Sequence, residues 1–250
     1  MRSESFQELK QEWDRIGGSW QSDIDVSNKK DVSYLRLKSI LQLKEYLDYQ
    51  DLNVLDLGCN NGLYSYIIGD KFKKVLGIDS DELSIKRALI TKKFFEKDGY
   101  NLNNIEFNTT TFEEYCINRK YQVDELTLKG ALWNGERHDL IINSDFENDN
   151  INAILACEIL SLFDDNLMNI FNKVLENVKL IMIQSNNTKV DKWNSYKISL
   201  QDEIIEYLKQ QGFSKIEIVS PGLNHNYVSV PIREKFDVRL YNCGIIIGKK

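Results

Sequence analysis

The chain is predicted to be an α/β protein built on a doubly wound, mostly parallel sheet of seven strands. From residue 53 on, short apolar runs alternate with amphipathic segments, the pattern of strands joined by helical crossovers. The first two runs each end in an acid, Asp56 and Asp79, and a glycine turn follows the first acid. Because ligands of such sheets bind beyond the carboxyl ends of the strands, these features predict a ligand site at that edge.

Seven apolar runs are expected to form the strands. They begin at residues 54–55 and continue at 75–78, 105–107, 153–157, 180–183, 216–219 and 243–247. Residues 51–250 are therefore expected to form one domain. Residues 1–50 precede the first strand and are expected to form a helical cap, because apolar residues recur near one helical stripe at Leu37, Ile40, Leu41 and Leu47.

Apolar residues with helical spacing mark the helices between the strands. After the second strand, Ile85, Ala88 and Leu89 stand at i, i+3 and i+4. After the fourth strand comes the clearest periodicity of the chain, formed by Leu167, Ile170, Phe171, Val174, Leu175 and Val178. A last helix is expected around Ile204, Ile205 and Leu208, with Gly212 as its C-cap.

Residues 116–150 interrupt the alternation of strand and helix. Two strand-like runs, 126–133 and 138–142, flank Asn134-Gly135, a strong signal for a two-residue hairpin turn. We interpret this segment as an inserted β-hairpin. In a rival registration Leu140–Ile142 would be the fourth strand of the sheet, but no clear helix follows that run.

Composition narrows the classes of partner. The 250 residues carry a net charge of −6, with 32 basic and 38 acidic residues, so nucleic acid is an unexpected partner. No apolar run approaches the ~18 residues of a membrane span and no signal-peptide core is present, so a cytoplasmic protein without membrane association is expected. The four cysteines are widely spaced and only two histidines are present, which predicts free thiols and no metal site.

The turn Gly58-Cys-Asn-Asn-Gly62 is the strongest sequence signal for a ligand. Its glycines let backbone approach a ligand where a Cβ would intrude. Asp79 lies 21 residues beyond Gly58, close to the distance at which a second-strand acid binds ribose hydroxyls. Asp56 would disfavour a pyrophosphate nearby, whereas a cofactor with a sulfonium and an ammonium group would favour this carboxylate.

The run Asp56-Leu-Gly58-Cys-Asn60-Asn-Gly62 resembles the first motif of the class I S-adenosylmethionine (SAM)-dependent methyltransferases. The usual form is acid-x-Gly-x-Gly-x-Gly; here Asn60 replaces the middle glycine, and some branches of the family carry Cys-Asn at this point. The resemblance covers about residues 50–250 without the hairpin. It implies SAM as cofactor, S-adenosylhomocysteine (SAH) as product, and a last strand that enters the sheet antiparallel.

The resemblance also assigns cofactor-binding roles. The turn would line the methionine part, Asp79 would accept both ribose hydroxyls, and Thr111 with Phe112 would meet the adenine. For Asp79 the alternative role is a helix cap, and for Thr111 and Phe112 it is a polar turn with a core phenylalanine. The expected cofactor-binding residues are Asp56, Gly58, Cys59, Asn60, Gly62, Asp79, Ser80, Thr111, Phe112 and Cys157.

Two residues are candidates for catalysis. Cys157-Glu158-Ile-Leu-Ser-Leu162-Phe is similar to the family's Glu-x-Leu-x-His segment, but Leu162 stands where many members have histidine. Glu158 would bind substrate or cofactor, or simply begin a helix. His225, in the long connection 221–241, is the best candidate for a general base, with a surface histidine as the alternative.

Further polar residues are expected near the edge of the sheet where the ligand would bind, and most of them could orient a polar substrate. They are Gln184, Asn186 and Asn187 after the fifth strand, Tyr227, Arg233 and Arg239 in the long connection, and Arg36 in the cap, which could pair with the cofactor's carboxylate. For the long connection the alternative is an ordinary solvated loop, and for Arg36 a surface arginine.

The function expected from these features is methyl transfer from SAM to an oxygen or nitrogen of a small polar acceptor, such as a sugar or other metabolite. The acidic composition and the abundance of Asn, Tyr and Trp favour such an acceptor over RNA or protein. Two alternatives stand beside it: an RNA or protein methyltransferase, and a non-catalytic methyltransferase-like partner. A nicotinamide oxidoreductase is disfavoured by Asp56 and Asn60.

Overall fold

The computed structural model describes residues 32–118, 126–133, 136–142, 151–157, 163, 165–184, 201–219 and 244–250, together with residues 11 and 15. Its centre is a seven-stranded sheet in the order β3-β2-β1-β6-β7-β9-β8, which confirms the predicted fold class. The strands are β1 (Tyr49–Leu57), β2 (Phe72–Asp79), β3 (Ile105–Thr109), β6 (Ile151–Cys157), β7 (Leu180–Gln184), β8 (Lys215–Val219) and β9 (Ile245–Lys249).

The direction of the strands matches the expectation from the resemblance. β3, β2, β1, β6 and β7 pair in parallel, whereas β9 pairs antiparallel with both β7 and β8. The carboxyl ends of five strands therefore meet at one edge of the sheet. This edge carries the glycine turn after β1 and the acid at the end of β2.

Several strand boundaries differ from the prediction, among them the starts of β1 and β9. β1 begins at Tyr49 rather than near residue 54, since Tyr49 already pairs with Phe72 of β2 although the next two residues are exposed. β9 begins at Ile245 rather than at residue 243. Backbone pairing, rather than hydrophobicity alone, sets where a strand starts.

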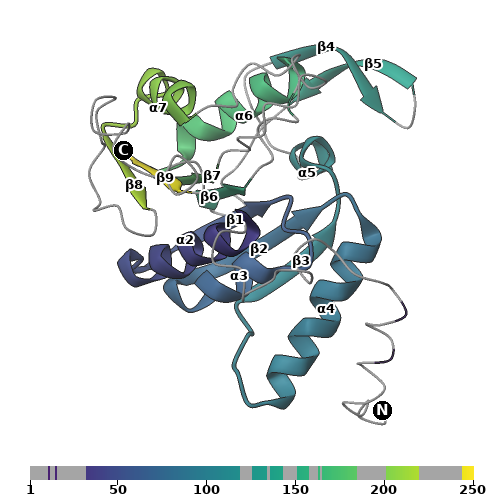
Figure 1. The fold of residues 1–250 in the computed structure, drawn as a ribbon. Helices are drawn as coiled ribbons and strands as arrows, with labels where there is room; N and C mark the ends of the chain where they lie inside the picture. Colours follow the sequence, from purple (N-terminus) through teal and green to yellow (C-terminus); the bar gives the residue numbers. More distant parts are fainter. Residues whose placement is uncertain are drawn as a thin grey trace.

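Helices cover both faces of the sheet (Figure 1). On one face lie α2 (Val32–Tyr46), α3 (Leu63–Ile68) and α4 (Glu82–Lys97); on the other lie α5 (Phe112–Asn118), α6 (Asp165–Asn177) and α7 (Gln201–Gln210). Residues of β1 alternate between the two cores: Val54 packs with the first group, Leu55 and Leu57 with the second. Helix α2 is the described part of the expected N-terminal cap.

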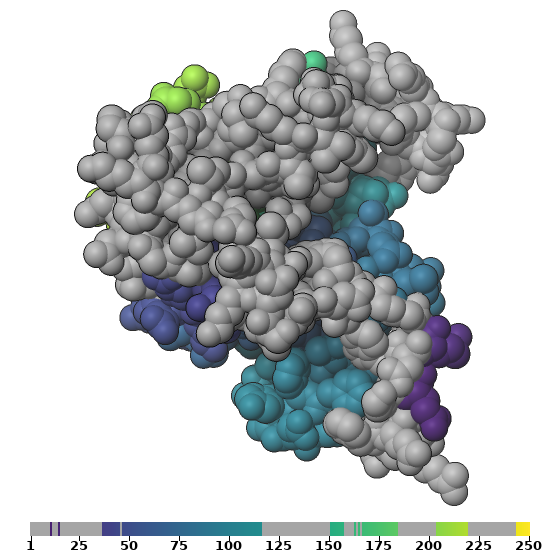
Figure 2. Space-filling model, viewed as in Figure 1, coloured from purple at the N-terminus to yellow at the C-terminus, as the bar shows by residue number. Residues whose placement is uncertain are grey.

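The apolar stripe of α6 is confirmed. Ile170, Phe171, Val174 and Leu175 are buried, and Leu167 packs against the same core. Two residues of the other predicted stripes are exposed instead: Leu41 on α2 and Leu89 on α4, at 47% and 43%. Figure 2 shows α4 reaching the molecular surface. On α2 and directly after it, the predicted residues Leu37, Ile40 and Leu47 do pack in the core, and Leu43 takes the place expected for Leu41.

The inserted hairpin is confirmed as a separate element. β4 (Leu126–Trp133) and β5 (Glu136–Ile142) pair antiparallel in a two-stranded sheet of their own. The rival registration is wrong, because β6 supplies the fourth strand of the main sheet. In Figure 1 the hairpin lies beside α6. Within the described ranges, no helix combines the length and the apolar character that crossing a membrane requires.

We expect the core of the α6 face to depend on Phe171. This side chain is fully buried and meets the rings of Phe112 and Phe163 edge-on, at 6.0 and 5.6 Å between centroids. Phe171→Ala should lower the free energy of unfolding by about 3–5 kcal/mol, because it leaves a cavity among these rings. Urea denaturation measures this change. Leu89→Ala, on an exposed helical site, is the control and should change it by less than about 0.5 kcal/mol; equal effects would contradict the described packing.

Candidate functional site

The turn after β1 uses three left-handed residues. Gly58, Asn60 and Gly62 have φ angles of 66°, 51° and 79°. Asparagine is one of the few residues other than glycine that adopts this conformation readily, so Asn60 fills the place of the motif's middle glycine without changing the turn. Its side-chain Oδ1 accepts the N–H of Asn61 at 2.8 Å, which holds the turn locally.

Packing also requires glycine at position 62. A Cβ there would lie 2.6 Å from Cζ of Phe107 on β3, closer than any real contact. The turn therefore rests directly on the aromatic side chain beneath it. Backbone bonds complete its anchoring: the N–H of Cys59 donates to Ile78 O at 3.0 Å, across to β2.

Asp79, at the end of β2, connects two turns. Its Oδ2 accepts the N–H of Asn60 and its Oδ1 accepts the N–H of Asp81, both at 2.9 Å. A carboxylate oxygen has two lone pairs, so each oxygen can accept a second hydrogen bond. This capacity is what two ribose hydroxyls would need.

The alternative role for Asp79, capping α4, belongs to Asp81. The side chain of Asp81 accepts the N–H groups of Leu83 and Ser84 at 3.3 and 3.1 Å and the Ser84 hydroxyl at 2.6 Å. The Ser84 hydroxyl is the main reason that the pKa of Asp81 lies below its ordinary value. Asp81, and not Asp79, caps α4, and Asp79 lines the cavity at the strand ends.

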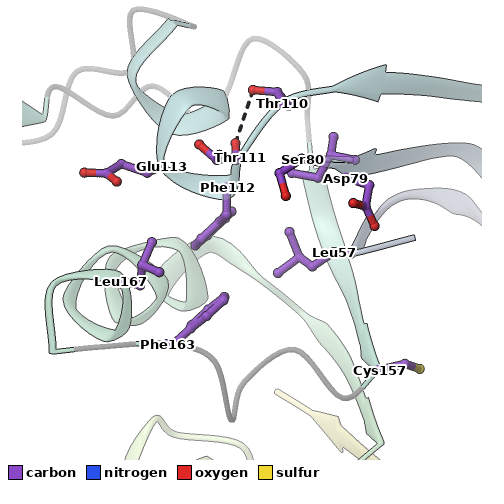
Figure 3. A pocket seen from close by; sticks show the side chains of 12 residues that line it. Leu57, Asp79, Ser80, Thr110, Thr111, Phe112, Glu113, Cys157, Phe163 and Leu167 are labelled. Carbon is purple, nitrogen blue, oxygen red and sulfur yellow. Dashed lines mark hydrogen bonds between the residues drawn. The ribbon is translucent and has the colours of Figure 1, made fainter. Parts of the chain in front are cut away.

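That cavity has a volume of about 450 Å³, within the range of small-molecule sites (Figure 3). Six of the predicted cofactor residues line it: Gly58, Asp79, Ser80, Thr111, Phe112 and Cys157. Sequence reasoning missed the other six, Leu57, Ile78, Thr110, Glu113, Phe163 and Leu167. Leu57, Ile78 and Thr110 adjoin predicted residues, and this adjacency was a usable signal. Phe163 ends the segment compared with the Glu-x-Leu-x-His motif and Leu167 begins the apolar stripe of α6, but neither pattern indicated that these side chains line a cavity.

The first turn of α5 shows the structural role considered for Thr111 and Phe112, and their contact with adenine stays a prediction. Thr111 forms a capping box with Glu114: its hydroxyl accepts the Glu114 N–H at 3.0 Å, and Glu114 Oε2 accepts the Thr111 N–H at 3.1 Å. Phe112 is 8% exposed and stacks on Phe163, with centroids 5.7 Å apart and planes at 6°. Both residues thus serve the fold and also line the cavity.

Four predicted turn residues do not line the described cavity: Asp56, Cys59, Asn60 and Gly62. Asp56 is 2% exposed, and its Oδ2 accepts the Ser65 hydroxyl at 2.5 Å. Burial raises the pKa of Asp56 to about 7; the bond from Ser65 lowers it in part, and the charge of Asp79 raises it. Burial, with both carboxylates, also raises the pKa of the Cys59 thiol.

The two predicted catalytic residues, Glu158 and His225, lie outside the described residues, so their roles stay predictions. The same holds for Asn186, Asn187, Tyr227, Arg233 and Arg239, and for the side chain of Arg36. Gln184 is described: it ends β7, is buried, and accepts the Tyr64 hydroxyl at 3.3 Å. Cys59, Cys116 and Cys157 carry free thiols. In the described part of the chain, no group of three His, Cys, Asp or Glu residues is arranged to hold a metal ion.

The pKa of Asp56 makes a prediction for stability. Since this pKa is about 7 in the folded chain against an ordinary 3.8, folding favours the protonated acid. The stability from this group is complete below pH 3.8 and is lost as the pH rises to 7. Asp56→Asn mimics the protonated form. Its free energy of unfolding relative to the unmodified chain should therefore rise between pH 4 and 7, with a slope approaching about 1.4 kcal/mol per pH unit, and then level off.

Urea denaturation of both proteins between pH 4 and 8.5 measures this difference. Ser65→Ala provides the control, because it removes the hydrogen bond that lowers the pKa of Asp56. With that variant as background, the rise caused by Asp56→Asn should extend above pH 7. A difference that stays constant over the whole range would show that Asp56 does not titrate there in the folded chain.

Comparison with known proteins supports the identification of the fold. No protein-family model matches the chain. A curated relative is the ubiquinone biosynthesis O-methyltransferase of Rickettsia canadensis (strain McKiel), 26% identical over 122 residues, which are 48% of this chain and 47% of that protein. The chain thus spans about half the length of this relative.

Solved structures match over most of the chain. Magnesium protoporphyrin IX methyltransferase from Synechocystis PCC 6803, with bound SAM, matches with a TM-score of 0.51 at 15% identity. The match covers 96% of this chain and 90% of that protein's chain. The N-methyltransferase NodS from Bradyrhizobium japonicum, in complex with SAH, has a TM-score of 0.50 at 12% identity, with 96% of each chain covered. The chain therefore has the fold of these SAM-dependent methyltransferases.

Proposed function

We propose that the chain transfers a methyl group from SAM to an oxygen or nitrogen atom of a small polar acceptor, such as a sugar or another metabolite, and leaves SAH. The observation that carries this proposal is the position of Asp79. Its carboxylate lies at the wall of the cavity beside the glycine turn, and each of its oxygens can accept one more hydrogen bond. These are the acceptors that a ribose with two free hydroxyls requires.

The other walls suit an adenosine group. Leu57, Ile78 and Phe112 give the cavity an apolar side against which a purine ring can pack, and Phe163 and Leu167 extend it. Ser80, Thr110 and Glu113 supply polar atoms at the opposite side (Figure 3). A cavity with apolar walls and a few polar groups is typical of a cofactor site.

The charge of the site favours SAM over a dinucleotide. The residues described as lining the cavity include two acids, Asp79 and Glu113, but neither lysine nor arginine. Asp56 adds a third carboxyl group close enough to Asp79 for the charges to interact. Such surroundings attract a cation and repel a pyrophosphate. SAM carries a sulfonium and an ammonium group, so the residues present fit it.

Bound SAM supplies a methyl group that its sulfonium already activates. The task of the chain is then to align the acceptor with that methyl group, to exclude water and to take up the acceptor's proton. We propose Glu158 and His225 for this part of the site. Glu158 directly follows Cys157, which lines the cavity at the end of β6. His225 belongs to the connection between β8 and β9.

The proposed acceptor rests on composition and on the relatives. A net charge of −6 favours a small metabolite over RNA. The curated relative is an O-methyltransferase and NodS is an N-methyltransferase, which supports oxygen or nitrogen as the atom methylated. SAH release in the presence of sugars, amines and phenols would identify the acceptor class. Release only with RNA or protein would replace the small acceptor by a macromolecular one.

Asp79→Asn should weaken binding of SAM and SAH by at least about tenfold, because the amide offers one acceptor oxygen in place of two. Isothermal titration with SAM, SAH and NADH measures these affinities. Asp81→Asn is the matched control: it removes the same charge two residues away, and asparagine still caps α4. Its affinities should change by less than about twofold. Tight binding of NADH, or equal losses in the two variants, would contradict the proposed site.

A further inference from the structure

Three consecutive residues of α3 carry hydroxyl groups, and each donates to a different element of the fold. Tyr64 donates to Gln184 at the end of β7, Ser65 to Asp56 on β1, and Tyr66 to the backbone oxygen of Ala88 on α4. Helix α3 begins directly after the glycine turn, with Gly62 as its N-cap. The three bonds therefore connect α3 to three different elements, and only the bond of Tyr64 reaches β7.

Of these three bonds, only the bond from Tyr64 reaches a strand on the far side of β6. The strand order β2-β1-β6-β7 places β6 between the strand that leads into α3 and the strand that ends at Gln184. In the sheet register Gln184 is the partner of Cys157, the cavity residue at the end of β6. The bond from Tyr64 to Gln184 thus connects α3 to β7 past the end of β6.

The proposed function places the adenosine end of the ligand in the cavity. A ribose bound to Asp79 would lie over β2, and the apolar wall for a purine includes Ile78 on β2 and Phe112 at the start of α5, directly after β3. Because β3 is the edge strand, the remainder of an extended ligand runs the other way, past Gly58 toward β6 and β7. The Tyr64–Gln184 pair lies on that side.

Burial gives this pair a defined geometry. Tyr64 and Gln184 are 3% and 1% exposed. A buried amide and a buried phenol are costly to desolvate, and hydrogen bonds to fixed partners offset that cost only in a narrow range of positions. The separation of 3.3 Å is longer than the usual ~2.8 Å of a hydroxyl donor, so the bond itself adds little stability. Its effect is to set the position of α3 relative to β7.

We propose that Tyr64 and Gln184 are positioning residues for the end of the site that takes the amino-acid tail of the cofactor. The inference rests on the proposed function and deepens it. Tyr64 fixes the start of α3, and with it the backbone of the glycine turn, against the strand end toward which the tail points. The adenosine end, held by Asp79, does not depend on this pair.

SAH and adenosine separate the two ends of the site, because adenosine lacks the tail. Tyr64→Phe should lower the affinity for SAH about five- to tenfold, because the glycine turn loses its fixed position relative to β7, and leave the affinity for adenosine within about twofold. Tyr66→Phe is the matched control. It removes a hydroxyl from the same helix whose partner is on α4, and it should leave the affinities for both ligands unchanged.

A double-mutant cycle tests whether the two residues act as a pair. Gln184→Met keeps the volume and removes the acceptor. The double variant Tyr64→Phe/Gln184→Met should bind SAH no more weakly than the weaker of the single variants, because both changes remove the same interaction. Losses that multiply would overturn the pairing. Thermal denaturation of each variant establishes that the fold is retained.

The outcomes distinguish this inference from the function on which it rests. If the unmodified chain binds neither SAH nor adenosine, the proposed function fails and the inference fails with it. If it binds both and Tyr64→Phe weakens them equally, the effect is structural and the inference alone is overturned. The same holds if Tyr66→Phe acts like Tyr64→Phe, or if Tyr64→Phe has no effect on SAH.

Discussion

The two hydrogen bonds that Asp79 accepts connect the two turns beside the cavity at the strand ends. One comes from Asn60 in the turn after β1 and the other from Asp81 at the start of α4. Because β1 and β2 are neighbours in the parallel sheet, their loops emerge side by side, and a single carboxylate can join them. The left-handed residues of the glycine turn bring the N–H of Asn60 to this carboxylate. The glycine turn and the wall of the cavity beside it depend on this arrangement.

The site concentrates negative charge at a cost to the fold. Asp56 is buried, and its pKa is raised to about 7, so its ionised form is disfavoured in the folded chain. A cationic ligand would offset that cost by interacting with the carboxylate. Folding therefore favours the protonated form of Asp56, whereas a cationic ligand would favour the ionised form. The Ser65 hydroxyl moderates this opposition, because it stabilises the ionised acid.

Most of the fold could be predicted from the sequence, because its signals are local. Short apolar runs marked the strands, the Asn134-Gly135 signal marked the hairpin, and the six-residue apolar stripe marked α6. The failures have a physical cause as well. Leu41 and Leu89 have helical spacing, but spacing alone does not decide which side of a partly apolar helix meets the sheet.

Residues of the candidate site could be predicted where they directly follow a strand that the sequence marks. Gly58, Asp79 and Ser80 follow directly from the ends of β1 and β2. Phe163 and Leu167 could not be found in this way, because they reach the cavity through tertiary packing, in which Phe163, just before α6, stacks on Phe112 of α5. The burial of Asp56 is likewise a tertiary property: the motif indicates an acid, but it does not tell whether the acid contacts a ligand or supports the turn from below.

The antiparallel insertion of β9 has a consequence for the order in which the fold assembles. In the described sheet β8 pairs with β9 alone, and β9 separates it from β7. A ribosome produces β8 before β9, so β8 has no place in the sheet until the later strand arrives. The strands β1, β2 and β3 can pair as soon as they emerge. During synthesis the β3-β2-β1 side of the sheet can therefore form before β9 is made, whereas β8 cannot join the sheet until β9 pairs with β7.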